Sequence, residues 1–490
     1  MNETMRSGYS WRPHAGAAAP DFARSTTPAV MPIDPELVPF APPPQPLVGL
    51  PGLLAFRRNY IETFPRSAYE QGTTRISTGL TDMLLLCDPA LIQDMLVDRA
   101  DMFIRDRPSQ RALAPVLGED SLLLAEGADW RWQRRAAAPT FRHETLLSFV
   151  PVIAEIAAQQ VARWRHAGDA SAEANVAPVE VGAAMIRTTL DVIVATMLGG
   201  AANLNVEAYG RALGQVLEGA QWLALFAMLR LPRWIPYPRW WRTLRARNYL
   251  RREMQRIIAT RRARPSSRPD LLDLLVTARD AETGRHMTDA ELLTNLLTFI
   301  NAGHETTAVA LTWTLWLVAR DTAVQEQLVG EVRAVAREGA IEAAHIDRLV
   351  LCRQVIQEAM RLYPPVPALG RQPRVALTLG EHRIAPTTSV VVPIFALHRH
   401  ERLWENPLTF VPGRFAPEAG KGRPRCAYMP FGAGPRVCIG ASFAMLEATV
   451  ILATLVRAFR LRPVAGHKPK PVARVSLRLH DGMPLRVEPR

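Results

Sequence analysis

A single cysteine stands in a short loop whose other residues could prepare it to hold a metal. In the stretch PFGAGPRVCIG, Cys438 follows Arg436 by two residues and precedes Gly440 by two. A metal-binding thiolate must be shielded and must accept hydrogen bonds from backbone N–H groups, and glycines permit the turns that such a loop needs. The stretch 438–459 is expected to run on as a long helix, so Cys438 sits just before a helix N-terminus, where the helix dipole favours a thiolate. The alternative is a buried structural cysteine in a tight turn.

Polar residues also interrupt a long apolar segment at 292–320. The segment is apolar nearly all round, which is typical of a helix that runs through a protein centre. Ala302 and Gly303 are small enough for a flat ligand to approach the backbone, and Glu305 and Thr306 follow as an acid and a hydroxyl that could relay protons. Buried polar groups are costly unless they are satisfied or used. The alternative for Thr306 is a hydroxyl that bonds back to a carbonyl of its own helix.

These two segments together resemble the cytochrome P450 family. The family's haem-binding signature F-x-x-G-x-R-x-C-x-G is matched by Phe431, Gly434, Arg436, Cys438 and Gly440. The stretch AGHETT resembles the family segment that lies over the distal face of the haem. The resemblance implies that Cys438 is the axial ligand of the iron, that Ala302 and Gly303 face the haem, that Glu305 delivers protons and that Thr306 hydrogen-bonds on the oxygen side.

The elements that must position these residues are mainly helical. Helical periodicity predicts helices over 143–166, 182–199, 205–229, 239–262 and 288–337, the last broken near Asp321. Alternating patterns predict strands within 81–89 and 374–393 and a terminal hairpin over 473–489. The expected fold is therefore mostly α with a minor β region, and the resemblance implies one large domain with haem between the distal helix and the cysteine loop. Residues 1–40 are expected to form a disordered or loosely attached tail, and 41–490 the haem-thiolate domain.

A charge set is expected to hold the fold around this site. Glu358 and Arg361 lie three residues apart, on one helix face. They resemble the family's E-x-x-R, and the resemblance implies that Arg414 completes a structural triad. Gly413 stands where the family's P-E-R-F box has glutamate, which puts only a local carboxylate contact in question.

Cationic side chains are needed to bury the two propionates of a haem. Trp130 and Arg134 resemble the family's W-x-x-x-R helix, four residues apart on one face, and Arg436 is a further clamp. The resemblance assigns a last clamp to Arg374. Arg371 lies close enough to replace it if the strand register slips.

Composition bears on compartment and partners. The formal charge is +13, but only three basic residues are lysine, and no nucleic-acid motif accompanies them. Four scattered cysteines favour a reducing compartment. No uninterrupted apolar run reaches the roughly 18–20 residues of a membrane span, and the N-terminus lacks a secretory h-region. We therefore expect a soluble, cytoplasmic, bacterial protein without a transmembrane segment and without a nucleic-acid partner.

The resemblance implies a monooxygenase that carries haem b (iron protoporphyrin IX), uses O₂ and receives NAD(P)H electrons through a separate ferredoxin or flavodoxin with its reductase. Lys421, Arg423 and Arg425 offer a basic dock for that partner, or merely a solvated charged turn. A peroxygenase or haem isomerase without a redox partner is one alternative. A non-catalytic haem protein is another.

The substrate side of the pocket is expected to be apolar. The resemblance places there the segment 104–125, Phe299, the stretch from Val366 to Leu369, and Met483. The motifs resemble the fatty-acid-hydroxylating bacterial branch, so a fatty acid or a terpenoid is the first choice. Residues 222–265, rich in Trp and Arg, match the family's lid, either with a solvated arginine face or in contact with anionic lipid.

Overall fold

Helices dominate the part of the chain that the structure, a computed structural model, describes: residues 42–77, 82–169, 177–199, 204–232, 234–264 and 270–490. The tail expected over 1–40 lies outside these residues. The α-helices are α1 (Gly49–Asn59), α2 (Ser67–Glu70), α3 (Pro89–Gln93), α4 (Arg107–Leu117), α5 (Gly127–Ala137), α6 (His143–Leu147), α7 (Val150–Asp169), α8 (Val181–Leu198), α9 (Val206–Met228), α10 (Trp240–Ala263), α11 (Leu271–Thr277), α12 (Asp289–Arg320), α13 (Thr322–Val335), α14 (Val350–Leu362), α15 (Ile394–Leu397) and α16 (Ala441–Ala458).

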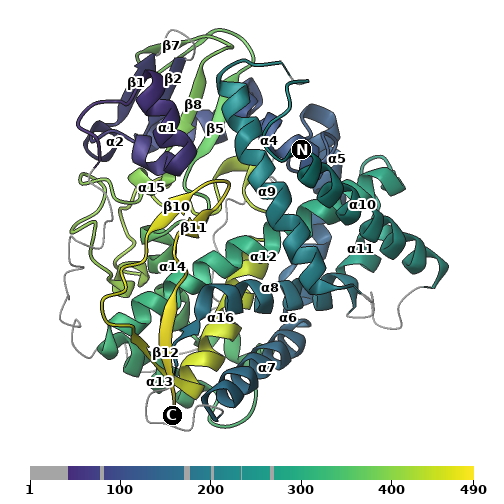
Figure 1. The fold of residues 1–490 in the computed structure, drawn as a ribbon, viewed down its shortest axis with the longest axis vertical. Helices are drawn as coiled ribbons and strands as arrows, with labels where there is room; N and C mark the ends of the chain where they lie inside the picture. The colour runs from purple at the N-terminus through teal and green to yellow at the C-terminus, as the bar shows by residue number, and fades with distance from the viewer. Residues whose placement is uncertain (1–41, 78–81, 170–176, 200–203, 233, 265–269) are drawn as a thin grey trace.

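Strands form a minor part, as expected. The largest sheet has the order β1-β2-β8-β5-β3, in which only β2 and β8 pair in parallel. Figure 1 shows this sheet at the upper left, with the long helices below it and to its right. The strands are β1 (Thr73–Ser77), β2 (Asp82–Leu86), β3 (Phe103–Arg105), β4 (Val179–Glu180), β5 (Leu369–Pro373), β6 (Leu377–Leu379), β7 (His382–Ile384), β8 (Ser389–Val392), β9 (Phe459–Pro463), β10 (Pro471–Ala473), β11 (Leu477–Leu479) and β12 (Pro484–Pro489).

The central helix α12 is fixed at both ends by its own sequence. Thr288 and Glu291 form a capping box at its start, each side chain accepting from the other's backbone N–H. Asp321 ends the helix and caps α13 by accepting from the N–H of Val324, so the predicted break lies where the structure has it. Most residues of α12 are buried, and Figure 1 shows it crossing the middle of the molecule.

The predicted terminal hairpin over 473–489 was wrong. β11 pairs with β10, whereas β12 pairs with β9 and β4 in a different sheet. Arg474 to Ser476 therefore form the turn of the β10–β11 hairpin. The alternating pattern was read correctly as strand, but alternation does not identify a strand's partner.

Three helical stretches of the described residues are long and apolar enough to cross a membrane by length and composition, namely His143–His166, α8 and α16. None of the three is an uninterrupted apolar run, since α8 contains Arg187 and Asp191 and α16 contains Glu447 and Arg457. In the structure 50%, 61% and 72% of their respective apolar windows are buried inside the protein, so much of this apolar surface packs in the core.

The structure brings the three charged residues of the expected triad together. Arg361 donates to both carboxylate oxygens of Glu358, and both side chains are fully buried. Arg361 also donates to three backbone carbonyls, those of His398, Pro407 and Thr409. The Nε of Arg414 lies 3.4 Å from Glu358 Oε1. This network ties α14 to the loop that leads to the cysteine.

Candidate functional site

Backbone hydrogen bonds within the cysteine loop fix its conformation. The N–H of Cys438 donates to the carbonyl of Phe431 at 2.9 Å, and a one-turn 3₁₀ helix spans Gly434–Arg436. Gly434 has φ +72°, and a Cβ there would overlap the carbonyl oxygen of Leu96. Only glycine fits this close approach. α16 then begins at Ala441, so the cysteine precedes a helix N-terminus, as its sequence predicts.

The sulfur of Cys438 faces a large internal cavity. The residue is exposed to that cavity, although protein surrounds it on every other side. Burial raises the pKa of the thiol, while the N–H of Gly440 and the nearby Arg134 cation act to lower it. A thiol in such surroundings is deprotonated readily only when a further positive charge, such as a metal ion, lies against it.

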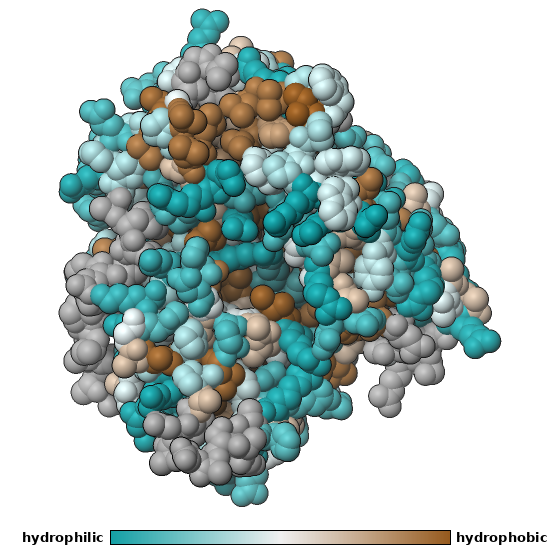
Figure 2. Space-filling model, in the orientation of Figure 1, coloured by the Kyte–Doolittle hydropathy of each residue, from teal (hydrophilic) through white to brown (hydrophobic). Residues whose placement is uncertain are grey.

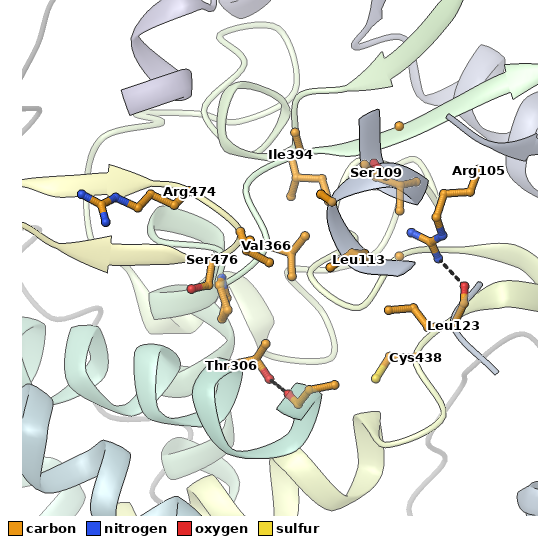
Figure 3. Close-up of a pocket in the computed structure, with 18 of the residues that line it drawn as sticks. Arg105, Ser109, Leu113, Leu123, Thr306, Val366, Ile394, Cys438, Arg474 and Ser476 are labelled. Atoms are coloured by element: carbon orange, nitrogen blue, oxygen red, sulfur yellow. Dashed lines mark hydrogen bonds between the residues drawn. The ribbon is translucent and has the colours of Figure 1, made fainter. Parts of the chain in front are cut away.

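The cavity has a volume of about 670 Å³ and separates the cysteine loop from α12. Figure 3 shows Cys438 and Thr306 on opposite sides of the lower part of the pocket, with the apolar side chains of Leu113, Val366 and Ile394 above them. The chain thus places a thiol and a hydroxyl across an apolar chamber. This arrangement suits a flat ligand bound through the sulfur, with an apolar molecule above it.

The hydroxyl of Thr306 donates to the carbonyl of Ala302 at 2.7 Å. This is the back-bond considered from the sequence, and it leaves the oxygen's lone pairs free to accept at the cavity wall. Ala302 and Gly303 also line the cavity. A Cβ on Gly303, however, would come within 2.8 Å of Ile193 Cδ1, so its small size also lets α8 pack closely against α12.

Glu305 is buried and already paired. Its Oε1 accepts from the Ser476 hydroxyl and from Arg478 Nε, each at 2.6 Å. Burial raises the pKa of Glu305, but the attraction and hydrogen bond of Arg478 outweigh it and leave the pKa below its usual value. The carboxylate is therefore charged at neutral pH, one residue from Thr306. Its neighbour His304 bonds to the carbonyl of Ile300 and is kept neutral by burial, which lowers its pKa.

Several arginines line the cavity, and their charges show whether an anionic cofactor would be stabilised there. Arg105, Arg134, Arg371 and Arg436 all line it. Burial and repulsion from Arg105 and Arg436 lower the pKa of Arg371 to about 9, and the buried Nε of Arg105 has no hydrogen-bond partner among the described residues. Buried cations that repel one another are stabilised by an added anion. The residues therefore fit a haem, whose propionates would neutralise them.

Three of the four predicted clamp residues, Trp130, Arg134 and Arg436, lie at the cavity, as the resemblance implies. Trp130 and Arg134 both line the cavity on α5. The guanidinium of Arg436 lies 4.6 Å from the ring centre of Trp130 and pairs with Glu126 at 2.6 Å. The clamp is thus braced by an acid that the sequence analysis did not single out.

Arg374 does not reach the cavity, and Arg371 takes its place. Arg374 follows the end of β5, is 44% exposed, and donates to the carbonyl of Asp101 and pairs with Glu126 at 3.5 Å. Within β5 the strand pleat buries Arg371 instead. Arg105, on the neighbouring β3, lies within the segment 104–125 expected at the pocket, but it was not predicted as a cationic clamp. The feature that could have identified Arg105 as a clamp is its place at the end of a short strand that pairs with β5, opposite Arg371.

The substrate side matches the expected residues except at one position. Phe299, Val366 and Leu369 line the cavity, as do ten residues of 104–125. Met483 does not, because it directly precedes β12, which belongs to another sheet; it is fully buried, and its N–H bonds to Glu180. The turn of the β10–β11 hairpin occupies the position predicted for it.

The start of the described chain forms part of the cavity mouth, which the sequence analysis did not anticipate. Leu47, Val48 and Phe56 line the cavity. Leu47 and Val48, with Leu50 and Leu54 beside them, are also exposed to solvent. Figure 2 shows an apolar patch at the top of the molecule, over α1. No residue type or spacing marked this segment, because its role depends on where the chain folds back.

Comparisons with known proteins agree with this geometry. The cytochrome P450 family model matches residues 39–481. Cyclooctatin synthase of Streptomyces melanosporofaciens is 32% identical over 84% of this chain and 87% of that protein. Cytokinin hydroxylase of Arabidopsis thaliana is 31% identical over 84% of this chain and 80% of that protein. Human cytochrome P450 4A11 is 28% identical over 88% of this chain and 83% of that protein.

Solved structures show the same fold. The crystal structure of a cytochrome P450, CYP102L1, superposes with a TM-score of 0.78 at 25% identity, over 92% of this chain and all of that one. The cytochrome P450DA haem domain gives a TM-score of 0.75 at 23% identity, over 86% of this chain and 90% of that one. With the thiol, the arginine cluster and the distal hydroxyl in place, the chain belongs to the cytochrome P450 family and is a haem-dependent monooxygenase.

Proposed function

We propose that this monooxygenase hydroxylates a hydrophobic substrate, with a fatty acid or a terpenoid as first choice, using haem b as its cofactor. The observation that carries the proposal is the cavity of about 670 Å³ whose walls beyond Cys438 and Thr306 are mostly apolar. An apolar chamber excludes water and holds a C–H bond by shape rather than by hydrogen bonds. Regioselectivity then depends on the side chains nearest the reacting centre, such as Phe299 and Val366.

The chain's own residues have separate tasks. A haem bound here supplies the activation of O₂ and the insertion of one of its oxygen atoms into a C–H bond, while the other leaves as water. Cys438 would hold its iron, and Arg105, Arg134, Arg371 and Arg436 would hold its propionates. Thr306 presents a hydroxyl oxygen at the cavity wall, where it can accept or pass on a proton.

Glu305, the residue before Thr306 on α12, can resupply that proton from the cavity wall. Its carboxylate is bonded to Ser476 and to the partly exposed Arg478, and both Glu305 and Ser476 line the cavity. A proton taken up at the β10–β11 hairpin therefore has an acceptor one residue from Thr306. Since the pKa of Glu305 is lowered, the group serves as a transient carrier and not as a stored proton.

We propose that electrons reach the enzyme from NAD(P)H through a separate ferredoxin or flavodoxin and its reductase. Of the three basic residues expected to form the dock, Arg423 lies over the rings of Trp404 and Phe415, and Lys421 pairs with Glu418. Arg425 is exposed. Lys421 stays 72% exposed despite its surface pair, so Lys421 and Arg425 are the two of these three side chains that an acidic partner could reach. A cytoplasmic location remains part of the proposal.

Binding and turnover assays test both halves of the proposal. Fatty acids, terpenes and steroids should be titrated against the haem-loaded protein while the haem absorbance is followed, and ligands that shift it should be oxidised with ferredoxin, reductase and NADPH. Product formation only with peroxide would favour a peroxygenase instead, and no NADPH consumption with any ligand or donor would favour a non-catalytic haem protein. Thr306→Ala is the matched variant, and we expect it to divert electrons to peroxide while binding is retained.

A further inference from the structure

A second cavity, of about 430 Å³, lies between α9, α10 and the end of α4. Its volume falls in the range of small-molecule sites, about 300–1,000 Å³. Most of its lining is apolar or aromatic. The lining residues are Pro115, Val116, Val216, Ala220, Leu223, Trp234, Ile235, Pro236, Tyr237, Trp240, Thr243, Leu244 and Arg247. We call this space the lid chamber.

The lid chamber adjoins the haem-side cavity. Val116 of α4 and Ala220 of α9 line both spaces, so the wall between them is one side chain thick. α4 is also attached to the lid, because Arg111 donates to the carbonyls of Leu231 and Pro232. A molecule in the chamber would lie beside the substrate without touching Cys438 or Thr306, neither of which lines it.

One cation stands in this apolar lining. Arg247 is the only charged side chain of the lid chamber, and its buried Nε has no hydrogen-bond partner among the described residues. Its Nη2 reaches only the side-chain oxygen of the adjacent Asn248, at 3.3 Å. No acidic side chain of the described residues pairs with it. An unpartnered guanidinium edge in apolar surroundings is suited to a carboxylate.

The surroundings of the chamber favour an anion as well. Residues 230–264 contain twelve arginines against one acid, Glu253. The arginines toward the end of α10 have acidic partners, as in the pairs Arg256–Glu253 and Arg262–Asp289. Nearer the chamber, Arg242 and Arg245 instead lie over the ring of Trp241. Among the described residues, neither Arg242 nor Arg245 has an acidic partner, so their positive charge is not offset locally.

We propose that the lid chamber binds a long-chain fatty acid in its carboxylate form, with the hydrocarbon chain against Trp234, Tyr237 and Trp240 and the carboxylate on Arg247. The site is separate from the haem-side cavity, so its occupancy does not depend on the oxidation proposed above. Two molecules can then be held at once, one in each space, with Val116 and Ala220 between them. The molecule in the chamber is either the next substrate or an effector.

The first test counts molecules. Equilibrium dialysis of the haem-loaded protein with tritiated palmitate measures the number of palmitate molecules bound per protein. We expect one molecule that binds in the chamber without shifting the haem absorbance, in addition to any that shifts it. Arg247→Gln should weaken this spectrally silent binding about tenfold or more, the usual cost of losing a charge-assisted pair. Arg245→Gln removes the same charge from the same helix at an exposed position outside the chamber, and should weaken this binding less than threefold. Palmitate methyl ester, which lacks the carboxylate, should not bind the chamber.

A second measurement needs no variant. A palmitate analogue with a photoreactive diazirine at its chain end should label peptides of 216–223 and 234–244, in addition to any in the haem-side cavity. The proposal is overturned if no spectrally silent molecule binds, if Arg245→Gln and Arg247→Gln act alike, or if the label is confined to the haem-side cavity. If palmitate binds but never shifts the haem absorbance, the lid-chamber site is confirmed. That result would contradict only the proposal that a fatty acid is the substrate in the haem-side cavity. Slower turnover of dilute palmitate in Arg247→Gln would identify the chamber molecule as the next substrate. Loss of an effect of palmitate on the turnover of a different substrate would identify it as an effector.

Discussion

At the scale of single residues, backbone space around the cysteine matters as much as the sulfur. Gly432 and Gly434 both have positive φ, +77° and +72°. Nothing lies within 4 Å of a Cβ built on Gly432, whereas one built on Gly434 would overlap the Leu96 carbonyl. The two glycines thus share a left-handed backbone conformation, but only Gly434 lacks space for a Cβ. They can therefore serve as a matched pair of mutation sites.

We expect Gly434→Ala to lose haem and Gly432→Ala to keep it. Each alanine pays the left-handed backbone penalty of about 1–2 kcal/mol, but only at 434 must the Leu96 backbone also move, which displaces the cysteine loop. Haem content and urea unfolding of both variants check this. Equal haem content in the two proteins would show that the Leu96 contact does not control the loop.

The Glu305–Arg478 pair predicts a pH-dependent contribution to stability. The pKa of Glu305 is lowered from 4.5, so the stabilisation is present above about pH 4.5 and is lost as pH falls through the lowered value. Glu305→Gln should therefore reduce the free energy of unfolding by roughly 1–3 kcal/mol at pH 7 and by less at pH 4. Unfolding at both pH values, in a double-mutant cycle with Arg478→Gln, measures the coupling. A deficit that is the same at both pH values would contradict the pairing.

At the scale of elements, the register of β5 decides which arginine can meet a haem propionate. Arg371 and Arg374 are three residues apart, so in an extended strand they point to opposite faces. The structure buries Arg371 at 5% exposure and leaves Arg374 at the protein surface. The sequence shows both arginines in one short stretch, but it does not show where the strand ends.

Replacing these arginines should separate their roles. Arg371→Gln should speed haem loss about tenfold or more, because a charge-assisted hydrogen bond contributes about 1.5–3 kcal/mol. Arg374→Gln should change it less than threefold. Transfer of haem to apomyoglobin gives both rates. If Arg374→Gln proved the more damaging, the cavity-side assignment of Arg371 would be wrong.

The features that could be predicted from the sequence are those that depend on residues close together in the chain. The break at Asp321 and the cysteine loop depend on neighbours in the chain, and the structure has both where they were expected. The errors at Met483 and in the 473–489 hairpin have one source, since strand pairing is set by residues far away in sequence. The clamp role of Arg105 and the α1 residues at the cavity mouth were missed for the same reason.

At the scale of the whole molecule, the core does not divide. Buried apolar residues from Ile61 to Val487 belong to one cluster, and α12 packs against α4, α8, α10, α14 and α16. Chains beyond about 250–300 residues often split into separate cores, but the described residues of this one share a single core, and the cavity draws on segments from Leu47 to Ser476. We therefore expect the cavity and the rest of the fold to unfold together, at the same urea concentration.

The buried Glu358–Arg361 pair offers the sharpest test of that unity. Both side chains are fully buried, so Glu358→Gln leaves Arg361 with an uncompensated charge and should cost about 3–5 kcal/mol. If the chain unfolds as one unit, haem absorbance, far-ultraviolet circular dichroism and tryptophan fluorescence will share one urea midpoint in the parent protein, and all three midpoints will fall together in the variant. Met360→Leu, a volume-conserving change beside the pair, should shift them little. If the haem signal alone moved to lower urea, the network would stabilise only the cysteine loop, and the helical part would be an independent unit.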